Sequence, residues 1–290
     1  MILVVGSTGM LGGAIVRRLL ERGDKVRVVV RDDTGEQALS EAGAKTVRGD
    51  LKDAASLASA CDGISTVVTT ANSAGRGGED NVDTVDLEGN RNLIEAASRA
   101  GVEHFVFLSA EGADPESPVP FLRAKGTTSA RLRESGMAYT VLVPNLYMDV
   151  WIPLVVLAPV ASGRPITLVG EGARKHYLVA VDDVAGFTVA AVHSEDARNR
   201  DLLIGGPEAL SWRDVLSTFE RVHGVALEVE SIDPGQPMPG FPEAVSGLMA
   251  GLEMYDSPEP ISAAEAETTF GVKLTRVEGF VRRQKSMDAA

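Results

Sequence analysis

Residues 2–12 read ILVVGSTGMLG, and this stretch decides the fold. Residues 2–5 are all apolar, which is typical of a parallel strand covered on both faces. Downstream, Ile15, Val16, Leu19 and Leu20 recur at the spacing of one helical face. A buried strand, a glycine-rich turn and a helix, in this order, predict the start of a dinucleotide-binding fold.

Each glycine of the turn has a distinct predicted role. Gly6 permits the tight bend out of the strand, Gly9 lets the backbone approach a pyrophosphate, and Gly12 lets the helix pack against the sheet. The N-terminus of the helix offers free N–H groups and a partial positive charge to the phosphates. A glycine turn without a ligand is disfavoured by this context. The expected contacts are Gly6, Ser7, Thr8, Gly9, Met10, Leu11 and Gly12.

Beyond this turn, strands and helices alternate up to Pro144. Predicted strands cover 26–30, 46–47, 64–70, 105–108 and 139–143. Six strands joined by helices indicate an α/β fold, a doubly wound parallel-sheet Rossmann domain.

After Pro144 the alternation ends and prolines and glycines become denser. Helices are still predicted over 181–192 and 211–222, and strands over 202–204 and 227–232. We expect residues 1–150 to form the NADP(H)-binding Rossmann domain, with 178–206 returning to it. Residues 151–290 should form a smaller C-terminal α/β region that serves as substrate domain or lid.

The net charge of −13 disfavours nucleic acid and anionic membranes as partners. Cys61 is the only cysteine, so no intrachain disulfide can form, as is typical of a reducing compartment. The longest apolar stretch, 150–161, is interrupted by prolines and is too short to span a bilayer. No secretory signal opens the chain. We therefore expect a cytoplasmic protein, monomeric or homodimeric.

The end of the second strand predicts which nicotinamide cofactor binds. An acidic residue there favours NAD(H), whereas Arg31 can pair with a 2′-phosphate and stack on adenine. The acidic Asp32 beside Arg31 weakens this argument. The alternative is that Arg31 is a solvated surface side chain that binds no phosphate. NADP(H) is nevertheless favoured over NAD(H).

Further cofactor contacts are predicted where the next strands end. Asp50 can accept from the adenine amino group and Leu51 can pack on the ring, although Asp50 also suits a plain turn. Thr70, Ala71 and Asn72 leave the fourth strand at its carboxyl end, where ligands bind in this architecture.

These motifs together resemble the NmrA-like, atypical short-chain dehydrogenase/reductase family. The matching segments are GSTGMLG at 6–12, VVVR at 28–31, GDL at 49–51, AGVEHFVFLS at 100–109, AYTVLVPN at 138–145 and VAVDDVA at 179–185. The resemblance implies an NADP(H)-binding Rossmann domain and a small C-terminal domain that closes over a substrate cleft. Members include quinone reductases, dye reductases and redox-sensing regulators.

The usual catalytic pattern of short-chain reductases is broken here. It requires a Tyr as general acid, with a Lys one helical turn later that lowers the phenol pKa and holds the nicotinamide ribose. Lys125 is present, but Phe121 occupies the position of the Tyr. Ser109 lies near the position of the expected serine, but Ala110 follows it. We take Lys125 and Ser109 as candidate catalytic residues, and Lys125 also as a cofactor contact.

Pro144 and Asn145 leave the sixth strand where the nicotinamide should lie. Phe121, Tyr147 and Met148 are candidates for the substrate pocket, although Met beside an aromatic is more often core. His176 and Tyr177 could supply a replacement acid, but we expect them at the surface. The histidines show no metal spacing, and no nucleophile elbow is present.

Two functions follow from these predictions. The first is an NADPH-dependent oxidoreductase that transfers hydride to a small aromatic or quinone-like acceptor. The second is a non-catalytic NADP(H)-binding redox sensor that acts through a protein partner, and Phe121 keeps this alternative open. A sugar-nucleotide epimerase or dehydratase is disfavoured because the Tyr is missing.

Overall fold

A computed structural model describes residues 1–33, 35–74, 76–241 and 243–288. The chain divides into two compact units. Unit 1 contains residues 1–144, 184–203 and 270–272, and unit 2 contains residues 145–183, 204–269 and 273–290.

Unit 1 is built on a seven-stranded sheet with the order β3-β2-β1-β4-β5-β6-β8. Its strands are β1 (Ile2–Val5), β2 (Val26–Val30), β3 (Lys45–Arg48), β4 (Thr66–Thr69), β5 (His104–Leu108), β6 (Ala138–Pro144) and β8 (Arg200–Ile204). β1 pairs in parallel with β2 and with β4, which places the switch in strand order beside β1. Ligands bind at such a switch point in this architecture.

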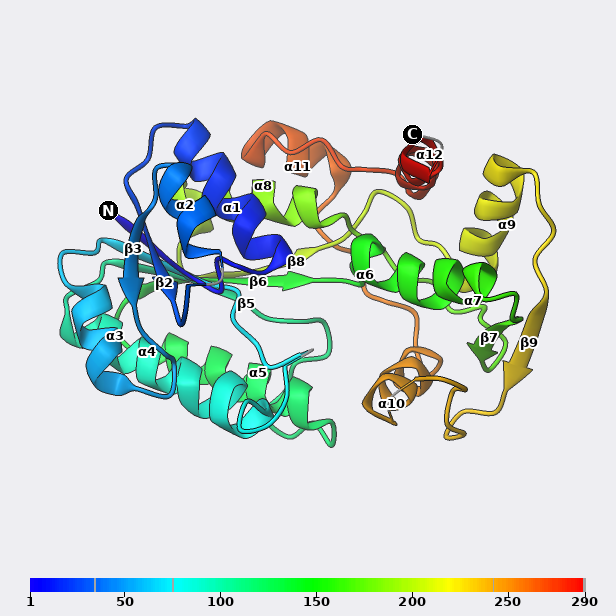
Figure 1. The fold of residues 1–290 in the computed structure, drawn as a ribbon, viewed down its shortest axis with the longest axis horizontal. Helices are drawn as coiled ribbons and strands as arrows, with labels where there is room; N and C mark the ends of the chain where they lie inside the picture. The colour runs from blue at the N-terminus through cyan, green and yellow to red at the C-terminus, as the bar shows by residue number, and fades with distance from the viewer. Residues whose placement is uncertain (34, 75, 242, 289–290) are drawn as a thin grey trace. The chain divides into compact units, whose positions relative to one another are not determined.

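Helices cover both faces of this sheet (Figure 1). α1 (Met10–Glu21), α2 (Glu36–Glu41) and α8 (Val181–His193) lie on one side, and α3 (Ala54–Cys61), α4 (Glu88–Arg99) and α5 (Pro120–Arg133) on the other. A π-helical segment, Val82–Leu87, leads into α4, and a 3-10 turn, Glu195–Ala197, follows α8. The predicted doubly wound parallel sheet is thus confirmed.

Local sequence explains where these elements begin. β1, β2, β4 and β5 are buried at every position, as expected of strands covered on both faces. The Asp53 side chain caps α3 by accepting from two backbone N–H groups. Asn81 and Thr84 form a reciprocal capping box at the start of the π-helical segment. Pro120 occupies the first position of α5, where no N–H is required.

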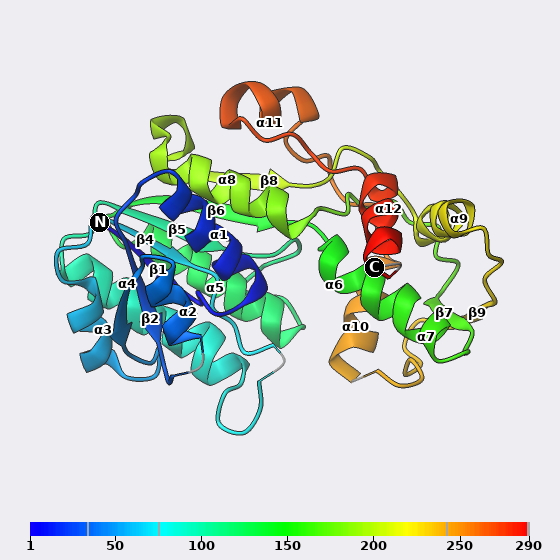
Figure 2. The same cartoon turned by 45° about the horizontal axis from the view of Figure 1, so that its top comes forward.

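Unit 2 contains a parallel pair of strands, β7 (Ile166–Val169) and β9 (Val229–Ile232), visible in Figure 2. Its helical segments are α6 (Met148–Ile152), a π-helical turn (Pro153–Leu157), α7 (Ala158–Ala161), α9 (Trp212–His223), α10 (Glu243–Leu252), α11 (Ala263–Phe270) and α12 (Val277–Asp288). α9 packs on α12, and Arg221 pairs with Glu278 across this contact.

Several elements of unit 2 were not predicted. The apolar stretch 150–161 is helical with a π-helical turn at Pro153–Leu157, and its apolar residues show no single helical period. β7, α10, α11 and α12 were also missed. Of the helices that the structure describes, none is long and apolar enough to span a bilayer.

The core of unit 1 contains one buried histidine, His104 on β5, which is 0% exposed. Its Nε2 lies 2.9 Å from the Thr140 hydroxyl, which donates to the Ala197 carbonyl at 2.7 Å. Nε2 therefore carries the proton and donates to Thr140. Nδ1 has no hydrogen-bond partner among the described residues. Burial, and then the charge of Arg198, lower the pKa of His104 to about 4.

We expect Gly12→Ala to destabilise the protein, because a Cβ at residue 12 would lie 2.1 Å from the Gly6 carbonyl oxygen. The loss should reach about 1–3 kcal/mol or more, measured by urea unfolding. Gly13→Ala is the matched control: its Cβ would meet Ser7 at an ordinary 3.5 Å, and alanine should stabilise the helix by up to about 1 kcal/mol. Equal stability of the two variants would contradict the conclusion that the Gly6 carbonyl leaves no room for a side chain at residue 12.

A second prediction concerns acid. The pKa of His104 is lowered from 6.5 in a free chain to about 4, so the unfolded chain binds the proton more tightly. The contribution of neutral His104 to the free energy of unfolding is fully present above pH 6.5. It should fall by about 3 kcal/mol as the pH drops toward 4. His104→Gln, which cannot be protonated, should flatten this loss in pH-dependent unfolding. His193→Gln, at a partly exposed histidine, should retain it, and an unchanged profile in His104→Gln would refute the assignment.

Candidate functional site

The glycine turn between β1 and α1 is shaped by backbone contacts. Gly6 has a φ of 88°, a left-handed conformation that favours glycine. The Gly9 N–H donates to the Gly6 carbonyl at 3.1 Å. Gly12 passes so close to that carbonyl that no side chain fits between them. The turn thus brings the N-terminus of α1 up against the end of β1.

The N-terminus of α1 has no side-chain cap, because the N-cap residue is Gly9. Helical geometry leaves the first amides of any helix without intrahelical acceptors, and the helix dipole places partial positive charge there. Ser7 is buried with its hydroxyl 3.5 Å from the Val29 carbonyl, whereas Thr8 and Met10 are exposed and Leu11 is half-buried. This end of α1 can receive an anion.

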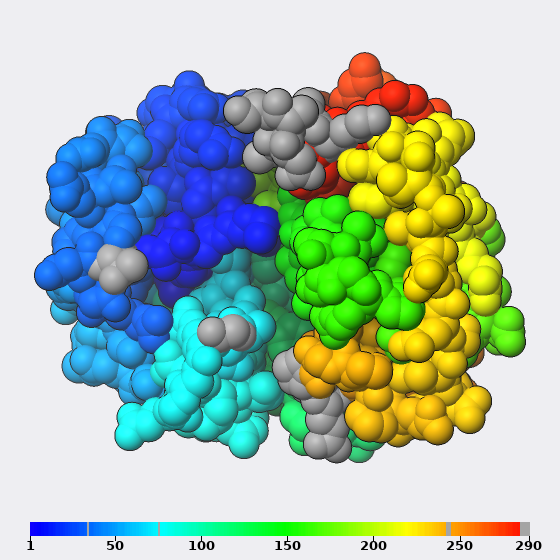
Figure 3. Space-filling model, turned by 45° about the vertical axis from the view of Figure 1, so that its right-hand side comes forward, coloured from blue at the N-terminus to red at the C-terminus, as the bar shows by residue number. Residues whose placement is uncertain are grey.

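A pocket of about 150 Å³ opens beside the turn. It is lined by Val5, Gly6, Thr8, Val29, Val30, Arg31, Asp32, Gly49, Asp50, Leu51, Ala71 and Arg76. The lining comes from the carboxyl ends of β1, β2, β3 and β4, where the sequence predicted the adenosine half of the cofactor. In Figure 3 the N-terminal segment, dark blue, lies next to the segment that follows β4, cyan.

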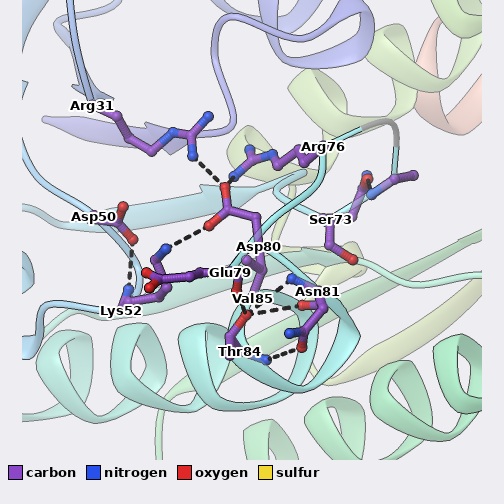
Figure 4. A network of polar contacts seen from close by, with 12 residues as sticks. Arg31, Asp50, Lys52, Ser73, Arg76, Glu79, Asp80, Asn81, Thr84 and Val85 are labelled. Atoms are coloured by element: carbon purple, nitrogen blue, oxygen red, sulfur yellow. Dashed lines mark hydrogen bonds and ion pairs between the residues drawn. The ribbon is translucent and has the colours of Figure 1, made fainter.

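Beside the pocket, three cationic side chains converge on one carboxylate, that of Asp80 (Figure 4). Arg31 lies 2.5 Å from Asp80 Oδ2 and Arg76 lies 3.4 Å from the same oxygen. The Lys52 ammonium lies 2.6 Å from Oδ1. The contacts with Lys52, and then those with Arg31, lower the pKa of Asp80. The hydrogen bond to Asp80 in turn raises the pKa of Lys52.

The other predicted residues of this region make hydrogen bonds with the backbone. Asp50 Oδ1 accepts from the Lys52 backbone N–H at 2.8 Å. The Thr70 hydroxyl lies 3.4 Å from the Gly6 carbonyl, and the Asn72 amide donates to the Thr70 carbonyl at 3.3 Å. Neither Thr70 nor Asn72 lines the pocket, whereas Leu51 and Ala71 do.

Lys125, on α5, is buried with a side chain only 3% exposed. Its ammonium donates to the Leu108 carbonyl at 2.9 Å and lies 4.9 Å from the Phe107 ring centroid and 5.6 Å from that of Phe121. Burial lowers the pKa of Lys125 to about 8, and the charge of Asp86 opposes this shift. Lys125 is therefore an ammonium that loses its proton at about pH 8, well below the pH at which an exposed lysine does.

The sequence did not reveal Asp86, which is fully buried where the π-helical segment joins α4. Asp86 Oδ2 accepts from the Ser73 N–H at 2.9 Å and from its hydroxyl at 2.6 Å. Oδ1 has no hydrogen-bond partner among the residues that the structure describes. A buried carboxylate near Lys125 supplies the negative charge that the buried ammonium needs.

Ser109 follows β5 and is 7% exposed. Its hydroxyl lies 3.5 Å from that of Ser129, which donates to the Lys125 carbonyl at 2.9 Å. Gly126 packs directly on the chain after β5, since a Cβ there would lie 2.3 Å from the Asp114 carbonyl carbon. Half-buried Phe121 lies one helical turn before Lys125 and offers no exchangeable proton.

Pro144 ends β6 in unit 1, and its carbonyl accepts from the Glu111 N–H at 3.3 Å. The three remaining predicted residues belong to unit 2. Asn145 is 5% exposed and donates to the Ser257 hydroxyl at 3.0 Å. Tyr147 precedes α6, and Met148 is fully buried in the core of unit 2.

The expected surface position of His176 is wrong: this residue is 1% exposed within unit 2. Its Nε2 faces the Leu252 carbonyl at 3.1 Å, and its Nδ1 lies 2.7 Å from the Ser257 hydroxyl. These partners are 76 and 81 positions away, so no local pattern could reveal them. Tyr177 is half-buried.

Sequence reasoning missed Lys52, Arg76, Asp80 and Asp86. Lys52 directly follows the GDL segment, so its position after a strand was a usable signal. Arg76 and Asp80 lie in a segment without a predicted element, and nothing local marks them. Among the described residues, no group of three His, Cys, Asp or Glu could hold a metal ion.

The residues present fit a dinucleotide. The turn leaves no room for a side chain at Gly12, the α1 N-terminus lacks a side-chain cap, and the lining of the adjoining pocket includes Arg31 and Arg76. These are the features that a pyrophosphate and an adenosine with a phosphorylated ribose require.

Two curated relatives illustrate the sequence similarity. An NAD(P)H azoreductase of Xenophilus azovorans is 31% identical over 264 residues, covering 89% of this chain and 88% of the relative. Photosystem II assembly factor Ycf39 of Cyanophora paradoxa is 32% identical over 236 residues, covering 80% and 71% of the respective chains.

Solved structures share the fold. An NADPH-dependent quinone oxidoreductase of Escherichia coli, complexed with NADPH, has a TM-score of 0.82 at 20% identity, covering 98% of this chain and all of the other. The Citrobacter sp. triphenylmethane reductase complexed with NADP(H) has a TM-score of 0.77 at 20% identity, with 98% and 99% coverage. The family model of the NmrA-like family matches residues 1–281, and the chain therefore belongs to this family.

Proposed function

We propose that this protein is an NADPH-dependent oxidoreductase that reduces a small aromatic or quinone-like acceptor by hydride transfer. The observation that carries the proposal is the uncapped N-terminus of α1 beside a pocket lined by Arg31. An anion-receptive helix end and an arginine at the end of β2 suit the pyrophosphate and the 2′-phosphate of one dinucleotide.

We assign the glycine turn, with Ser7, Thr8, Met10 and Leu11, to the pyrophosphate. Arg31 pairs with the 2′-phosphate, and Asp50, Leu51 and Ala71 contact adenine. The cofactor continues past the carboxyl ends of the inner strands, where the candidate contacts are Thr70, Asn72, Lys125, Pro144 and Asn145. Tyr147 in unit 2 and Phe121 in unit 1 are each candidate substrate contacts. Met148 is fully buried in the core of unit 2 and is no longer a candidate.

When bound, a reduced nicotinamide supplies the hydride. Lys125 holds a positive charge in a buried position beside Leu108, where it can orient the ribose by donating hydrogen bonds. A quinone or conjugated dye that gains a hydride becomes a delocalised anion, so it needs no strong acid. A proton from the Lys125 ammonium, or from water, then completes the reduction. Ser109 helps to fix this region.

The similarity to an NAD(P)H azoreductase supports this proposal, because an azo dye is a conjugated hydride acceptor. The shared fold with NADPH-dependent quinone and dye reductases is consistent with it.

Phe121 supports a second candidate, an NADP(H)-binding sensor without turnover that acts through a protein partner. Phenylalanine cannot replace the usual general acid, and the related Ycf39 proteins are named as assembly factors. The two functions are separated by following NADPH absorbance with a panel of quinones and dyes. Oxidation with at least one acceptor supports the reductase, and tight NADPH binding without oxidation supports the sensor.

We predict that Arg31→Ala weakens binding of NADPH but not of NADH. The loss of a charge-assisted contact with the 2′-phosphate should cost about 10- to 100-fold in affinity, measured by calorimetry with both cofactors. Arg17→Ala, at an exposed arginine of α1, removes the same charge away from the pocket and should leave the ratio unchanged. An unchanged ratio in Arg31→Ala would exclude the assigned contact.

We also predict that turnover of an accepted quinone falls as the pH rises above about 8, because Lys125 then loses its proton. Lys125→Arg, which keeps its charge, should shift the fall to higher pH. Lys125→Met should lower kcat by about tenfold or more at neutral pH. Lys45→Met, at an exposed lysine of β3, should match the wild type. A Lys125→Met enzyme with the wild-type kcat and pH profile would exclude this role.

A further inference from the structure

Three cationic side chains meet at the Asp80 carboxylate, and the carboxylates of Asp50 and Glu79 also act on the Lys52 ammonium. Arg31 comes from the end of β2, Lys52 from the turn after β3, and Arg76 from the chain after β4, yet all three contact one carboxylate. The Asp80 side chain is 11% exposed, whereas its three partners are 27–43% exposed. The carboxylate is thus surrounded by cations that still reach solvent.

Three cations gathered in this way repel one another, and an anion at their centre offsets the repulsion. Asp80 is that anion, and the lowered pKa of its carboxyl keeps it charged. An arginine carries five N–H donors and a lysine three, so one carboxylate cannot satisfy the whole set. The cluster can therefore hold an anion with more charge and more acceptor oxygens than a carboxylate.

The position of the cluster identifies the anion. Arg31 and Arg76 both line the pocket that we assign to adenosine, whereas Lys52 and Asp80 lie beside it. The pyrophosphate is assigned to the α1 N-terminus, so the phosphate at the adenosine end is the one on the 2′ oxygen of the ribose. A phosphate monoester carries a charge of about −1.5 to −2 near pH 7 and three strong acceptor oxygens.

We propose that Arg31, Lys52 and Arg76 together bind the 2′-phosphate, and that Asp80 is an internal competitor for the same cations. This inference rests on the proposed function and deepens it. In the free protein Asp80 holds the cations together. When a 2′-phosphorylated nucleotide binds, the phosphate takes over these contacts, and the nearby carboxylate opposes it. Asp80 thereby lowers the affinity for NADP(H) and leaves that for NAD(H) unchanged.

The test uses two isomeric probes, adenosine 2′-monophosphate and adenosine 5′-monophosphate, which differ only in the position of the phosphate. Calorimetry on the full chain compares the wild type with Asp80→Asn. Removing the competing charge should tighten binding of the 2′ isomer by about tenfold, the equivalent of about 1.4 kcal/mol. The 5′ isomer should bind as it does to the wild type.

Two further variants control the experiment. Asp83→Asn removes one exposed carboxylate three positions further on and should change neither affinity. Lys52→Met should weaken the 2′ isomer about tenfold and spare the 5′ isomer, which tests the cation set even if Asp80→Asn fails to fold. Added salt should reduce the differences, since the contacts are partly exposed.

The inference is overturned if Asp80→Asn binds the 2′ isomer no more tightly than the wild type does, or if its affinity for both isomers rises equally. It is also overturned if Asp83→Asn produces the same gain or if Lys52→Met has no effect. NADH and NADPH titrations of the wild type separate this result from the proposed function. If the wild type binds NADH but Asp80→Asn does not change the affinity for the 2′ isomer, only the role of Asp80 as a competitor is rejected. If neither cofactor gives a heat of binding, the dinucleotide site itself is rejected.

Discussion

The close approach of Gly12 to the Gly6 carbonyl is the constraint on which the candidate site depends. Because nothing larger than hydrogen fits there, α1 begins directly against the end of β1, and its first amides face the switch in strand order. The pocket beside this turn is formed by the ends of four adjacent parallel strands. The helix end that we propose for the pyrophosphate and the pocket that we propose for adenosine therefore depend on the same backbone contact.

Much of unit 1 could be predicted because its signals are local. Apolar runs such as 2–5 and 26–30, the second interrupted only by Arg27, indicate covered strands, and glycines and caps mark the ends of helices. Unit 2 resisted prediction for the opposite reason. Its apolar stretch 150–161 is interrupted by prolines and includes a π-helical turn, so it carries no 3.6-residue period. Strand β7 and its partner β9 are four residues each and separated by some sixty positions, which leaves the pairing invisible in the sequence.

Some residues of the candidate site could likewise be predicted from local motifs, and others could not. The glycine turn and Arg31 follow from motifs, because each sits at a fixed offset from a strand. Asp86 and His176 could not be assigned, since their burial arises from partners remote in sequence: Asp86 lies near Lys125 and His176 contacts Ser257. Aspartate is mostly exposed and histidine is intermediate in burial, so an expectation based on residue type fails where distant segments cover these side chains.

The Arg31–Asp80 ion pair joins residues 49 positions apart. Its consequence concerns how cofactor preference is encoded. A comparison of related chains at the residue after β2 alone would treat cofactor selectivity as the property of a single residue. Here that residue, Arg31, is paired with a carboxylate beyond the fourth strand, which also binds cations from two other loops. An attempt to transplant selectivity into another scaffold would have to carry the whole charge constellation, because a single grafted arginine would arrive without its counterion.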